Sequence, residues 1–378
     1  MDNLDETRRR IDDIDTRLLA LFLERMQLAE DVAAYKIPRK LPVYNEKREK
    51  EVLASIKKNA CPQFSKSAAN LFSTIMRLSR EWQYAKASRQ DTDWALGNQL
   101  KSAANRRLTI QTAAYGGKEG SYSEQAAAKL FPDTELLASP GFEEACRAAS
   151  EGRADAAVLP LDNTTAGSVS GTGELLQKYG LYIFRSTVLT IKHALMAKPG
   201  TMLSDIREVR SHPQALAQCT GTIREHGWNA VPMDNTAFAA EYAASSPDGC
   251  VAAIGSEDAA RLYGLAILQK GINDSASNQT RFVAAAKEMS ILPAASKVSL
   301  VFRQAHESGT LANALAIFSD AGLNLMRIQS EPIPEAPWEY SFYLDFAAMA
   351  PDARAMAALY QLEKESHFMR LLGWYTEE

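Results

Sequence analysis

The most constraining feature of the chain is a stretch from Asp5 to Lys36 that contains neither Gly nor Pro. Apolar residues recur along it at the spacing of one helix face: Ile11, Ile14, Leu18, Leu21, Phe22, Leu28 and Val32. This pattern predicts one long amphipathic helix that ends near Pro38, because proline lacks the backbone N–H that a helix interior needs. So long a helix must bury its apolar face against other elements or another chain.

Two further helices are predicted within the first 90 residues. One begins after Pro42 and runs through Ile56, and the next runs from about Ser67 to Lys86. Three helices with such a long first member bury one another poorly. We therefore expect residues 1–90 to form an all-α domain of three helices that makes an intertwined dimer.

Bulk composition bounds the remaining possibilities. The chain of 378 residues is long enough for two or three domains, and 46% hydrophobic with 23% charged residues is ordinary for a globular protein. No run of 18 apolar residues predicts a membrane span, and the acidic N-terminus does not resemble a secretory signal. The four cysteines are scattered without a CxxC pair, which predicts reduced thiols in a cytoplasmic protein and no metal site.

Charge is distributed unevenly along the chain. Residues 1–90 hold 18 Lys and Arg against 13 Asp and Glu, a net charge of +5, so the remaining residues hold 24 against 33, a net charge of −9. A basic domain attracts nucleic acid or a small polyanion. Aromatic residues are sparse among these cations and no nucleic-acid motif is present, so we expect a small anion and no nucleic-acid partner.

The cations of the first helix are spaced for such an anion. Arg25 and Lys36 are eleven residues apart, about three turns, which places their Cα atoms roughly 16 Å apart on one face. Arg8 lies about 100° off that face, so we expect it to serve the partner's pocket instead of its own. Ser79 and Gln83 form a polar pair four residues apart within an apolar helix, which favours a site over a solvated face.

These residues resemble the active site of the all-helical chorismate mutase family, over nearly the whole block. The positions that match in order and near the family's spacing are Arg8, Arg25, Lys36, Arg48, Glu49, Ser79 and Gln83. The resemblance implies that Arg25 and the partner's Arg8 hold the two carboxylates of chorismate. It also implies that Lys36 and Gln83 donate to the ether oxygen, and that Glu49 accepts from the ring hydroxyl.

Arg48 and Ser79 would complete the wall of this pocket. Asn45 stands where the family often has Asp, although an amide can still bond a hydroxyl. The conversion of chorismate to prephenate is a unimolecular rearrangement that needs no cofactor. It needs a substrate folded into its reactive shape and donors where charge builds on the breaking bond, which Arg, Lys and Gln side chains supply.

Residues 91–106 are polar and weakly periodic, which predicts a partly ordered linker. Strand-like and helix-like segments then alternate through residues 107–288, beginning at Leu108, with one strand expected over Val188–Leu195 around His193. This alternation predicts α/β layers with a mainly parallel sheet. Polar loops at the carboxyl ends of strands bind ligands in such sheets.

The loops of this block together resemble prephenate dehydratase, in the family's order and approximate spacing. The matching stretches are Gly120-Ser121-Tyr122-Ser123, Pro160 to Gly167, Ser211-His212-Pro213-Gln214 with Gln218-Cys219, Leu262-Tyr263-Gly264-Leu265 and Thr280-Arg281-Phe282. The resemblance implies two α/β lobes like a periplasmic binding protein, with the site in the cleft. The implied reaction converts prephenate to phenylpyruvate with loss of CO₂ and hydroxide.

The resemblance also implies residue roles. Thr280 would be the catalytic donor to the departing hydroxyl and Arg281 would anchor a carboxylate. The substrate would further be held by Ser121, Asn163, Ser211 and Gln218. A Thr hydroxyl is a weak acid, so His212 or Asp162 is a candidate relay, although a structural role at a helix start is the favoured interpretation of His212. Asp162 stands where the family usually has Glu, and Gly116 where many members have Gln.

Residues 297–378 predict a third domain of mixed α+β structure in the order βαββαβ. This order resembles an ACT domain, which implies L-phenylalanine as a ligand of the regulatory site. The two stretches at the family's ligand positions are Gly309-Thr310-Leu311 and Gln329-Ser330-Glu331-Pro332. Glu331 reverses the charge of the family's Arg and Gln329 replaces its Glu, so we expect weakened or altered feedback.

The three blocks in this order resemble the bifunctional P-protein family of phenylalanine biosynthesis. The expected small-molecule partners are chorismate, prephenate and L-phenylalanine, and the expected assembly is a homodimer or higher homo-oligomer. Two alternatives stay open from the sequence: a non-catalytic sensor of aromatic acids or amino acids, and a protein with only one competent active site. Arogenate is an alternative to prephenate as the dehydratase substrate.

Overall fold

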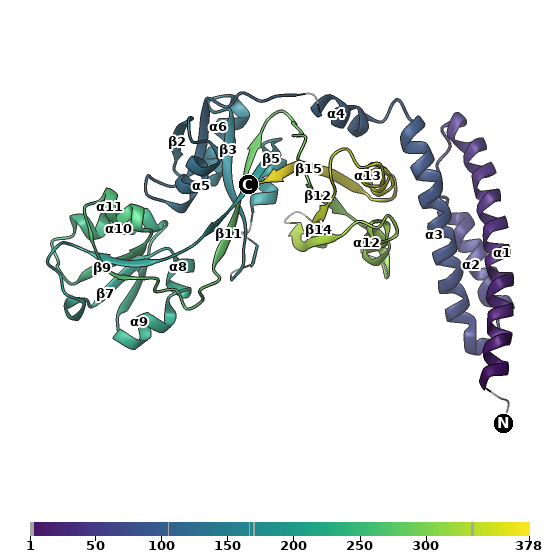
Figure 1. The fold of residues 1–378 in the computed structure, drawn as a ribbon, viewed down its shortest axis with the longest axis horizontal. Coiled ribbons are helices and arrows are strands. Elements are labelled where there is room, and N and C mark those ends of the chain that lie inside the picture. The colour runs from purple at the N-terminus through teal and green to yellow at the C-terminus, as the bar shows by residue number, and fades with distance from the viewer. Residues whose placement is uncertain (1–3, 105, 166, 169–170, 334–335) are drawn as a thin grey trace.

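The computed structural model describes residues 4–104, 106–165, 167–168, 171–333 and 336–378. Helices from the N-terminal 90 residues stand at one end of the molecule, a two-lobed α/β unit occupies the other end, and the C-terminal residues lie between them (Figure 1). In the parts of the chain described, no helix is long and apolar enough to cross a membrane.

The N-terminal block is helical, as predicted. Its elements are α1 (Leu4–Lys36), η1 (Ile37–Arg39), α2 (Glu46–Asn59), η2 (Pro62–Phe64) and α3 (Ser65–Gln90). Asn45 caps α2 because its side-chain oxygen accepts from the backbone N–H of Arg48 at 3.0 Å. The only α1 residues buried within one chain are Ala29 and Ala33, and its large apolar side chains remain exposed, Leu21 at 62%.

The segment that follows is more ordered than predicted. The linker predicted to be partly ordered contains the helix α4 (Ala95–Ala103). Trp94 is buried before this helix, where its ring stands edge-on to Tyr360 at 5.0 Å and its Nε1 donates to Glu363 at 2.6 Å. Tyr360 also donates to Asp91 at 2.8 Å. The connection is therefore fixed by contacts with a C-terminal helix that lies far away in the sequence.

The first lobe of the α/β unit holds two segments of the chain. Its elements are β1 (Thr112–Gly116), α5 (Tyr122–Leu130), β2 (Glu135–Ser139), α6 (Phe142–Glu151), β3 (Ala156–Asn163), β4 (Gly167–Ser168), α7 (Thr172–Lys178), β5 (Tyr182–Thr190) and, after the second lobe, β11 (Gln279–Ala286). The first strand begins at Thr112 and not at Leu108 as predicted.

The second lobe is one continuous segment. Its elements are β6 (Ala194–Ala197), η3 (Leu203–Asp205), β7 (Glu208–Ser211), α8 (Pro213–Ala217), α9 (Thr220–His226), β8 (Asn229–Pro232), α10 (Thr236–Ser245), β9 (Val251–Gly255), α11 (Glu257–Leu262) and β10 (Ala266–Lys270). Two connections join the lobes, and His193 lies in the first of them, between β5 and β6, so its prediction inside a strand was wrong.

The sheets are mixed, which corrects the prediction of a mainly parallel sheet. β1 pairs in parallel with β2 and β3, and β7 pairs in parallel with β8 and β9. However, β11 runs antiparallel to both β3 and β5, and β6 runs antiparallel to β9 and β10. The reason is that the chain leaves the first lobe along β5 and returns along β11, so these neighbours point in opposite directions.

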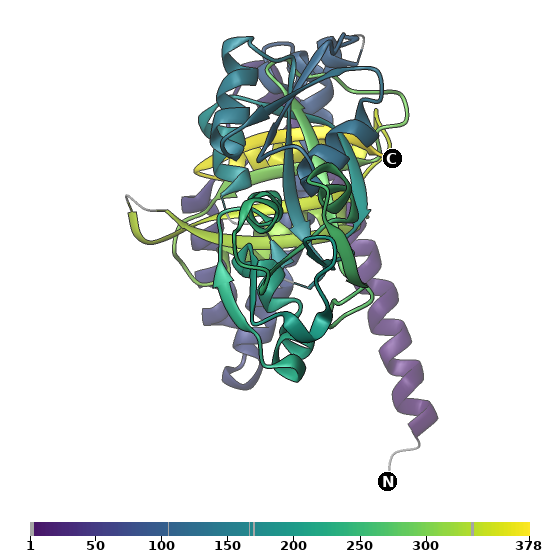
Figure 2. The ribbon, with the colours of Figure 1, turned by 90° about the vertical axis from the view of Figure 1, so that its left-hand side faces the viewer.

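The C-terminal domain has the predicted βαββαβ order. Its elements are β12 (Lys297–Arg303), α12 (Thr310–Asp320), β13 (Leu325–Ile333), β14 (Ala336–Ala347), α13 (Ala353–Glu365) and β15 (Phe368–Glu377). Its strands lie in the order β13-β14-β12-β15, and β15 pairs in parallel with β5. One continuous sheet therefore extends from this domain into the first lobe, and Figure 2 shows its yellow strands behind the two lobes. On the other side, α13 and α12 pack against α3.

Candidate active sites

A cavity of about 330 Å³ lies among the helices of the N-terminal block. It gathers seven of the eight residues predicted to bind chorismate: Arg25, Lys36, Asn45, Arg48, Glu49, Ser79 and Gln83. These residues come from all three helices and from the turn that precedes α2. The residues that helical spacing singled out in the sequence therefore line one pocket, which can receive a small anion.

Polar contacts hold the cations of this pocket in place. Arg25 donates to the Ser79 hydroxyl at 2.8 Å, and the Lys36 ammonium donates to the carbonyl of Val43 at 2.8 Å. Burial lowers the pKa of Lys36, and the nearby Glu49 carboxylate opposes this effect. The Gln83 amide donates to the Ser79 carbonyl at 3.2 Å, which leaves its second N–H for a ligand.

Arg8 lies apart from the pocket of its own chain. It stands near the start of α1, where it is exposed and pairs with Asp5 at 3.4 Å. Seventeen residues of helix separate it from Arg25, which corresponds to about 25 Å along the axis. No side chain spans that distance, so within one protomer Arg8 cannot contact a ligand held by Arg25.

Of the residues that line this pocket and were not predicted from the sequence, Arg80 is the charged one. This residue is 8% exposed, and its guanidinium contacts Glu49 of α2 and Glu365 of α13, the latter at 2.8 Å from Nε. It follows Ser79 by one residue, so it points about 100° away from Ser79 around α3. No local pattern identifies it, because its partners lie in two other elements.

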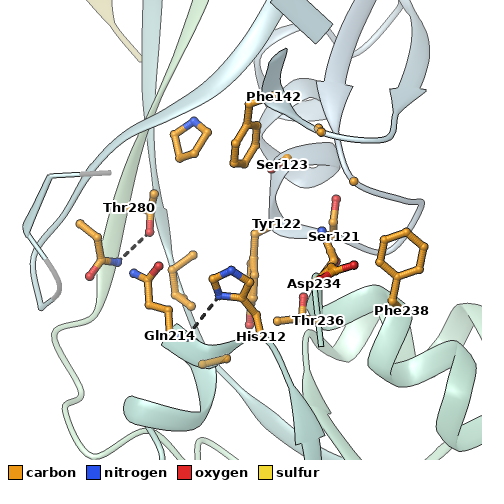
Figure 3. Close-up of a pocket in the computed structure, with 18 of the residues that line it drawn as sticks. Ser121, Tyr122, Ser123, Phe142, His212, Gln214, Asp234, Thr236, Phe238 and Thr280 are labelled. Carbon is orange, nitrogen blue, oxygen red and sulfur yellow. Dashed lines mark hydrogen bonds between the residues drawn. The ribbon is translucent and has the colours of Figure 1, made fainter. Parts of the chain in front are cut away.

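A second cavity, of about 400 Å³, lies in the cleft between the two lobes (Figure 3). The first lobe contributes the start of α5, the end of β3 and the start of β11, and the second lobe contributes α8 and the start of α10. Four of the predicted substrate residues line it: Ser121, Asn163, Gln218 and Thr280. Ser121 caps α5 by accepting from the backbone N–H of Glu124 at 3.3 Å.

Thr280 and Asn163 form the centre of a polar network in this cleft. The Asn163 amide donates to the Thr280 hydroxyl oxygen and to Asn278, both at 2.8 Å. The Asn278 amide in turn donates to Gln218 at 2.9 Å, and Gln218 donates to Thr165 at 3.0 Å. Because the Thr280 oxygen accepts from Asn163, its hydrogen can be directed into the cavity. The network thus orients one hydroxyl group as a donor.

Two histidines, His193 and His212, line the same cavity. Only His212 was considered as a site residue from the sequence. His212 caps α8, and its Nδ1 accepts from the backbone N–H of Gln214 at 3.2 Å, so its Nε2 carries the proton of the neutral ring. Burial lowers the pKa of His212, with Asp234 opposing this. His193, which sequence analysis placed in a strand, is 2% exposed, and burial lowers its pKa to about 4.

His193 connects the two lobes through its ring nitrogens. Its Nδ1 lies 3.2 Å from the Tyr122 hydroxyl of α5, and its Nε2 lies 3.1 Å from the Gln218 side-chain oxygen of the second lobe. The low pKa keeps the ring neutral at ordinary pH. Its position at the crossing between the lobes is a tertiary property that a strand pattern does not reveal.

Ser211 and Arg281, the other two residues predicted to hold the substrate, are not among the residues that line this cavity. Ser211 ends β7, an interior strand of its sheet, where it is buried and donates to the carbonyl of Ile254 at 2.6 Å. Arg281 is the residue after Thr280 on β11, so its side chain leaves the opposite face of the strand. There it binds Asp162 at 2.9 and 2.6 Å and Asp345 at 2.7 Å.

Asp162 is likewise turned away from the cleft, since it precedes Asn163 on β3 and pairs with Arg281. It is therefore not placed to relay a proton to Thr280, whereas His212 lines the same cavity as Thr280. Among the described residues that line the cavity there is no Lys or Arg. Neutral donors and the N-terminus of α5 are what this cleft offers to a carboxylate.

An apolar wall completes the cleft. Phe142, Phe238, Phe282 and the ring of Tyr122 also line the cavity. Figure 3 shows Phe238 on the far side of the cavity from Thr280. Outside it, Lys118 of the first lobe pairs with Glu241 of the second at 2.6 Å. The cleft thus combines a surface for a six-membered ring with oriented hydroxyl and amide donors.

The predicted regulatory residues lie on two elements of the C-terminal domain. Gly309 precedes α12 with a positive φ of 91°, and Thr310 and Leu311 open that helix. The other residues lie on β13, where the Gln329 amide donates to Glu331 at 3.0 Å. Burial raises the pKa of Glu331, while Ser330 and Pro332 alternate to the exposed face of the strand.

Comparison with known proteins covers nearly the whole chain. Residues 7–84 match the family model of chorismate mutase type II, and residues 113–290 match that of prephenate dehydratase. The bifunctional chorismate mutase/prephenate dehydratase of Neisseria gonorrhoeae is 32% identical over 372 residues, which cover 97% of this chain and 95% of that protein.

Two further relatives match about 70% of the chain. The arogenate dehydratase/prephenate dehydratase 2 of Arabidopsis thaliana is 38% identical over 74% of this chain and 76% of its own length. A solved prephenate dehydratase from Arthrobacter aurescens, in complex with L-Phe, superposes with a TM-score of 0.64 and 30% identity over 70% of this chain and 90% of that chain. Both activities predicted from the sequence are thus supported, and the chain belongs to the family of bifunctional chorismate mutase/prephenate dehydratases.

Proposed function

We propose that chorismate rearranges to prephenate in the pocket of α1–α3, and that prephenate becomes phenylpyruvate in the cleft between the lobes. The observation that carries the proposal is the convergence of seven predicted residues on one cationic pocket, together with the Asn163–Thr280 pair in the cleft. We place the functional boundaries at residues 1–90, 107–288 and 297–378.

In the mutase pocket, Arg25 binds one carboxylate of chorismate, and Lys36 and Gln83 donate to the ether oxygen. Charge develops on that oxygen as its bond to carbon breaks, so these donors bind the transition state more strongly than the substrate. Glu49 accepts from the ring hydroxyl. Asn45, Arg48 and Ser79 close the wall around the folded substrate.

The pocket is completed by Arg8 of a second protomer. Support comes from the exposed apolar face of α1, which includes Leu18 at 52% exposure and Leu28 at 59%, and which a second copy of this helix would bury. Mixing two inactive variants tests this. Arg8→Ala and Arg25→Ala chains, unfolded together and refolded, are expected to regain mutase activity, because some mixed sites carry both arginines. No recovery in a confirmed mixed dimer contradicts the shared site.

In the cleft, the Thr280 hydroxyl donates to the departing hydroxyl of the substrate. The Asn163 amide fixes the Thr280 oxygen, and the Nε2–H of neutral His212 supplies a second donor for the same cavity. Ser121 and the first backbone N–H groups of α5 bind a carboxylate, assisted by the helix dipole. Loss of CO₂ and hydroxide then gives an aromatic ring, and this aromatisation drives the reaction.

Prephenate and arogenate differ in one group, a side-chain keto group in place of an amino group. The Arabidopsis relative is named for both substrates. We propose prephenate, since the helical block of the same chain produces it. Parallel assays with both compounds decide between them: a higher kcat/KM for arogenate would overturn this choice.

We further propose that residues 297–378 form an ACT domain that binds L-phenylalanine in a cytoplasmic enzyme. Support comes from the βαββαβ order and from the Arthrobacter dehydratase, which was solved with L-Phe. The residues proposed to take part are Gly309, Thr310, Leu311, Gln329, Ser330, Glu331 and Pro332. Because Glu331 places a carboxylate where the family has Arg, weak binding is expected. Titration calorimetry that detects tight binding would contradict this expectation.

One product assay tests the proposed function as a whole. Purified protein is supplied with chorismate, and chorismate, prephenate and phenylpyruvate are followed over time, with and without L-phenylalanine. Phenylpyruvate is expected to form. Prephenate that accumulates without phenylpyruvate would indicate an inactive cleft, and no loss of chorismate would overturn the mutase assignment.

A further inference from the structure

Arg80 lies where the mutase pocket meets the C-terminal domain. It stands on α3, whose one side forms the pocket with α1 and α2 and whose other side packs against α12 and α13. Arg80 lines the pocket and also forms an ion pair with Glu365, a side chain of the C-terminal domain. It therefore connects two functional parts of the chain through one guanidinium group.

The contacts of Arg80 divide its planar fork between two carboxylates. Its Nε donates to Glu365 Oε1 of α13 at 2.8 Å, while one terminal nitrogen donates to Glu49 of α2. The ring of Tyr44 lies 5.0 Å beneath the guanidinium. Glu365 is fixed in turn, because the Gln361 amide donates to its Oε1 at 3.2 Å. An Arg fork suits this geometry, since its donors are rigidly directed.

We propose that Arg80 is a positioning residue of the mutase reaction, that it holds the Glu49 carboxylate in place for the ring hydroxyl of chorismate, and that Glu365 of the C-terminal domain sets its orientation. The geometry of the mutase site thus depends on a residue that lies 285 positions after Arg80 in the same chain and outside the pocket itself. This inference rests on the proposed role of Glu49 in the pocket.

Charge balance explains why Glu365 matters to Glu49. With both carboxylates present, one guanidinium charge is shared, and Glu49 keeps capacity to accept from a hydroxyl. Without the charge on Glu365, Arg80 has Glu49 as its single anionic partner and draws it out of the orientation that the substrate needs. The ring hydroxyl is present in both substrate and transition state, so its loss as a contact raises KM more than it lowers kcat.

The interface supplies a matched control. One helical turn before Arg80, Arg77 pairs with Asp320 of α12 and also donates to the carbonyl of Ala316 at 3.3 Å. This second ion pair joins α3 to the C-terminal domain, but neither of its members is among the residues that line the mutase pocket. Neutralising Asp320 therefore perturbs the same interface without changing the charges that face Glu49.

The experiment compares Glu365→Gln with Asp320→Asn in the full-length chain. Each variant is assayed with chorismate for mutase kinetics and with prephenate for dehydratase kinetics. Glu365→Gln is expected to raise the mutase KM about tenfold, because a charge-assisted hydrogen bond is lost. The mutase kcat is expected to stay within about twofold of the wild-type value. Asp320→Asn is expected to leave the mutase KM within about twofold, and the dehydratase rate of both variants confirms a folded chain.

A double variant shows whether Glu365 acts through Arg80. Arg80→Met raises KM, and adding Glu365→Gln to it is expected to cause no further increase. Equal effects of Glu365→Gln and Asp320→Asn, or additive effects with Arg80→Met, overturn the inference. If Glu49→Gln leaves the mutase KM unchanged while the wild-type chain converts chorismate, the proposed role of Glu49 is wrong. If the wild-type chain does not convert chorismate, the proposed function itself is refuted.

Discussion

Replacing Arg281 by Met separates a substrate contact from a structural ion pair. The family resemblance predicts that Arg281 anchors a carboxylate of prephenate. The structure instead places its side chain on the face of β11 opposite Thr280, in a cluster of two Arg and two Asp side chains whose charges sum to zero: Arg281, Arg327, Asp162 and Asp345. Asp345 is 1% exposed and also accepts from Ser299 at 2.7 Å.

The magnitude follows from the loss of one cation among two largely buried anions. Arg281→Met removes three charge-assisted hydrogen bonds and leaves a net charge of −1 in the cluster. Breaking a buried ion pair by removing one partner costs about 3–5 kcal/mol, because the remaining charge loses its compensation. For a unit of this size, such a loss lowers the unfolding midpoint by roughly 6–20 °C.

The assay combines thermal unfolding with dehydratase kinetics. Arg281→Met is expected to lower the midpoint by the amount given above, and the double variant Arg281→Met/Asp345→Asn is expected to recover much of it, because the cluster is neutral again. At a temperature where both variants are folded, the KM of the double variant for prephenate should stay within about threefold of wild type.

A different pattern would refute this reasoning. If Arg281→Met raised the KM for prephenate about a hundredfold with an unchanged midpoint, and the double variant did not recover, Arg281 would contact the substrate. The placement of its side chain behind β11 would then be wrong.

Further predictions concern the cleft and the cap of α2. Thr280→Val should lower dehydratase kcat about 10²–10³-fold while mutase kinetics stay unchanged, and Thr280→Ser should retain most of the rate because it keeps the hydroxyl. His193, with a pKa lowered by burial to about 4, binds fewer protons when folded than when unfolded, so stability should be full above about pH 6.5 and fall by up to about 3 kcal/mol as pH drops toward 4. Urea midpoints between pH 7 and 4.5 check this, and His193→Gln should flatten the slope. Asn45→Ala removes the α2 cap and should cost about 1 kcal/mol in the unfolding of the helical block, whereas Asn45→Asp should not.

The sequence predicts the helical pocket well because helical spacing is a local property. Arg25, Lys36, Ser79 and Gln83 share faces that a period of 3.6 residues defines, and they meet in one cavity. Arg80 escapes this reasoning, since its partners are brought to it by packing between α3 and distant elements.

The cleft shows where motif matching and physical pattern disagree. Thr280 and Arg281 are adjacent on a strand, so their side chains must leave opposite faces, and the same holds for Asn163 and Asp162 on β3. Strand alternation alone therefore predicts that each motif sends one residue into the cleft and its neighbour away from it. The position of His193 between the lobes could not be predicted in this way, because it depends on where the chain crosses from one sheet to the other.

The pairing of β15 with β5 has a consequence for dissection of the protein. Gly373 lies opposite Ile183 in this pairing, and a Cβ atom at that position would come 2.2 Å from the Ile183 carbonyl oxygen. Cutting the chain before β12 would remove β15 and leave β5 as a bare edge with unpaired backbone groups, which is a template for self-association. The strand at the C-terminus therefore covers an edge through which the dehydratase lobe would otherwise self-associate. A shortened enzyme would need another strand at this edge, carrying charged residues or proline, to remain monodisperse.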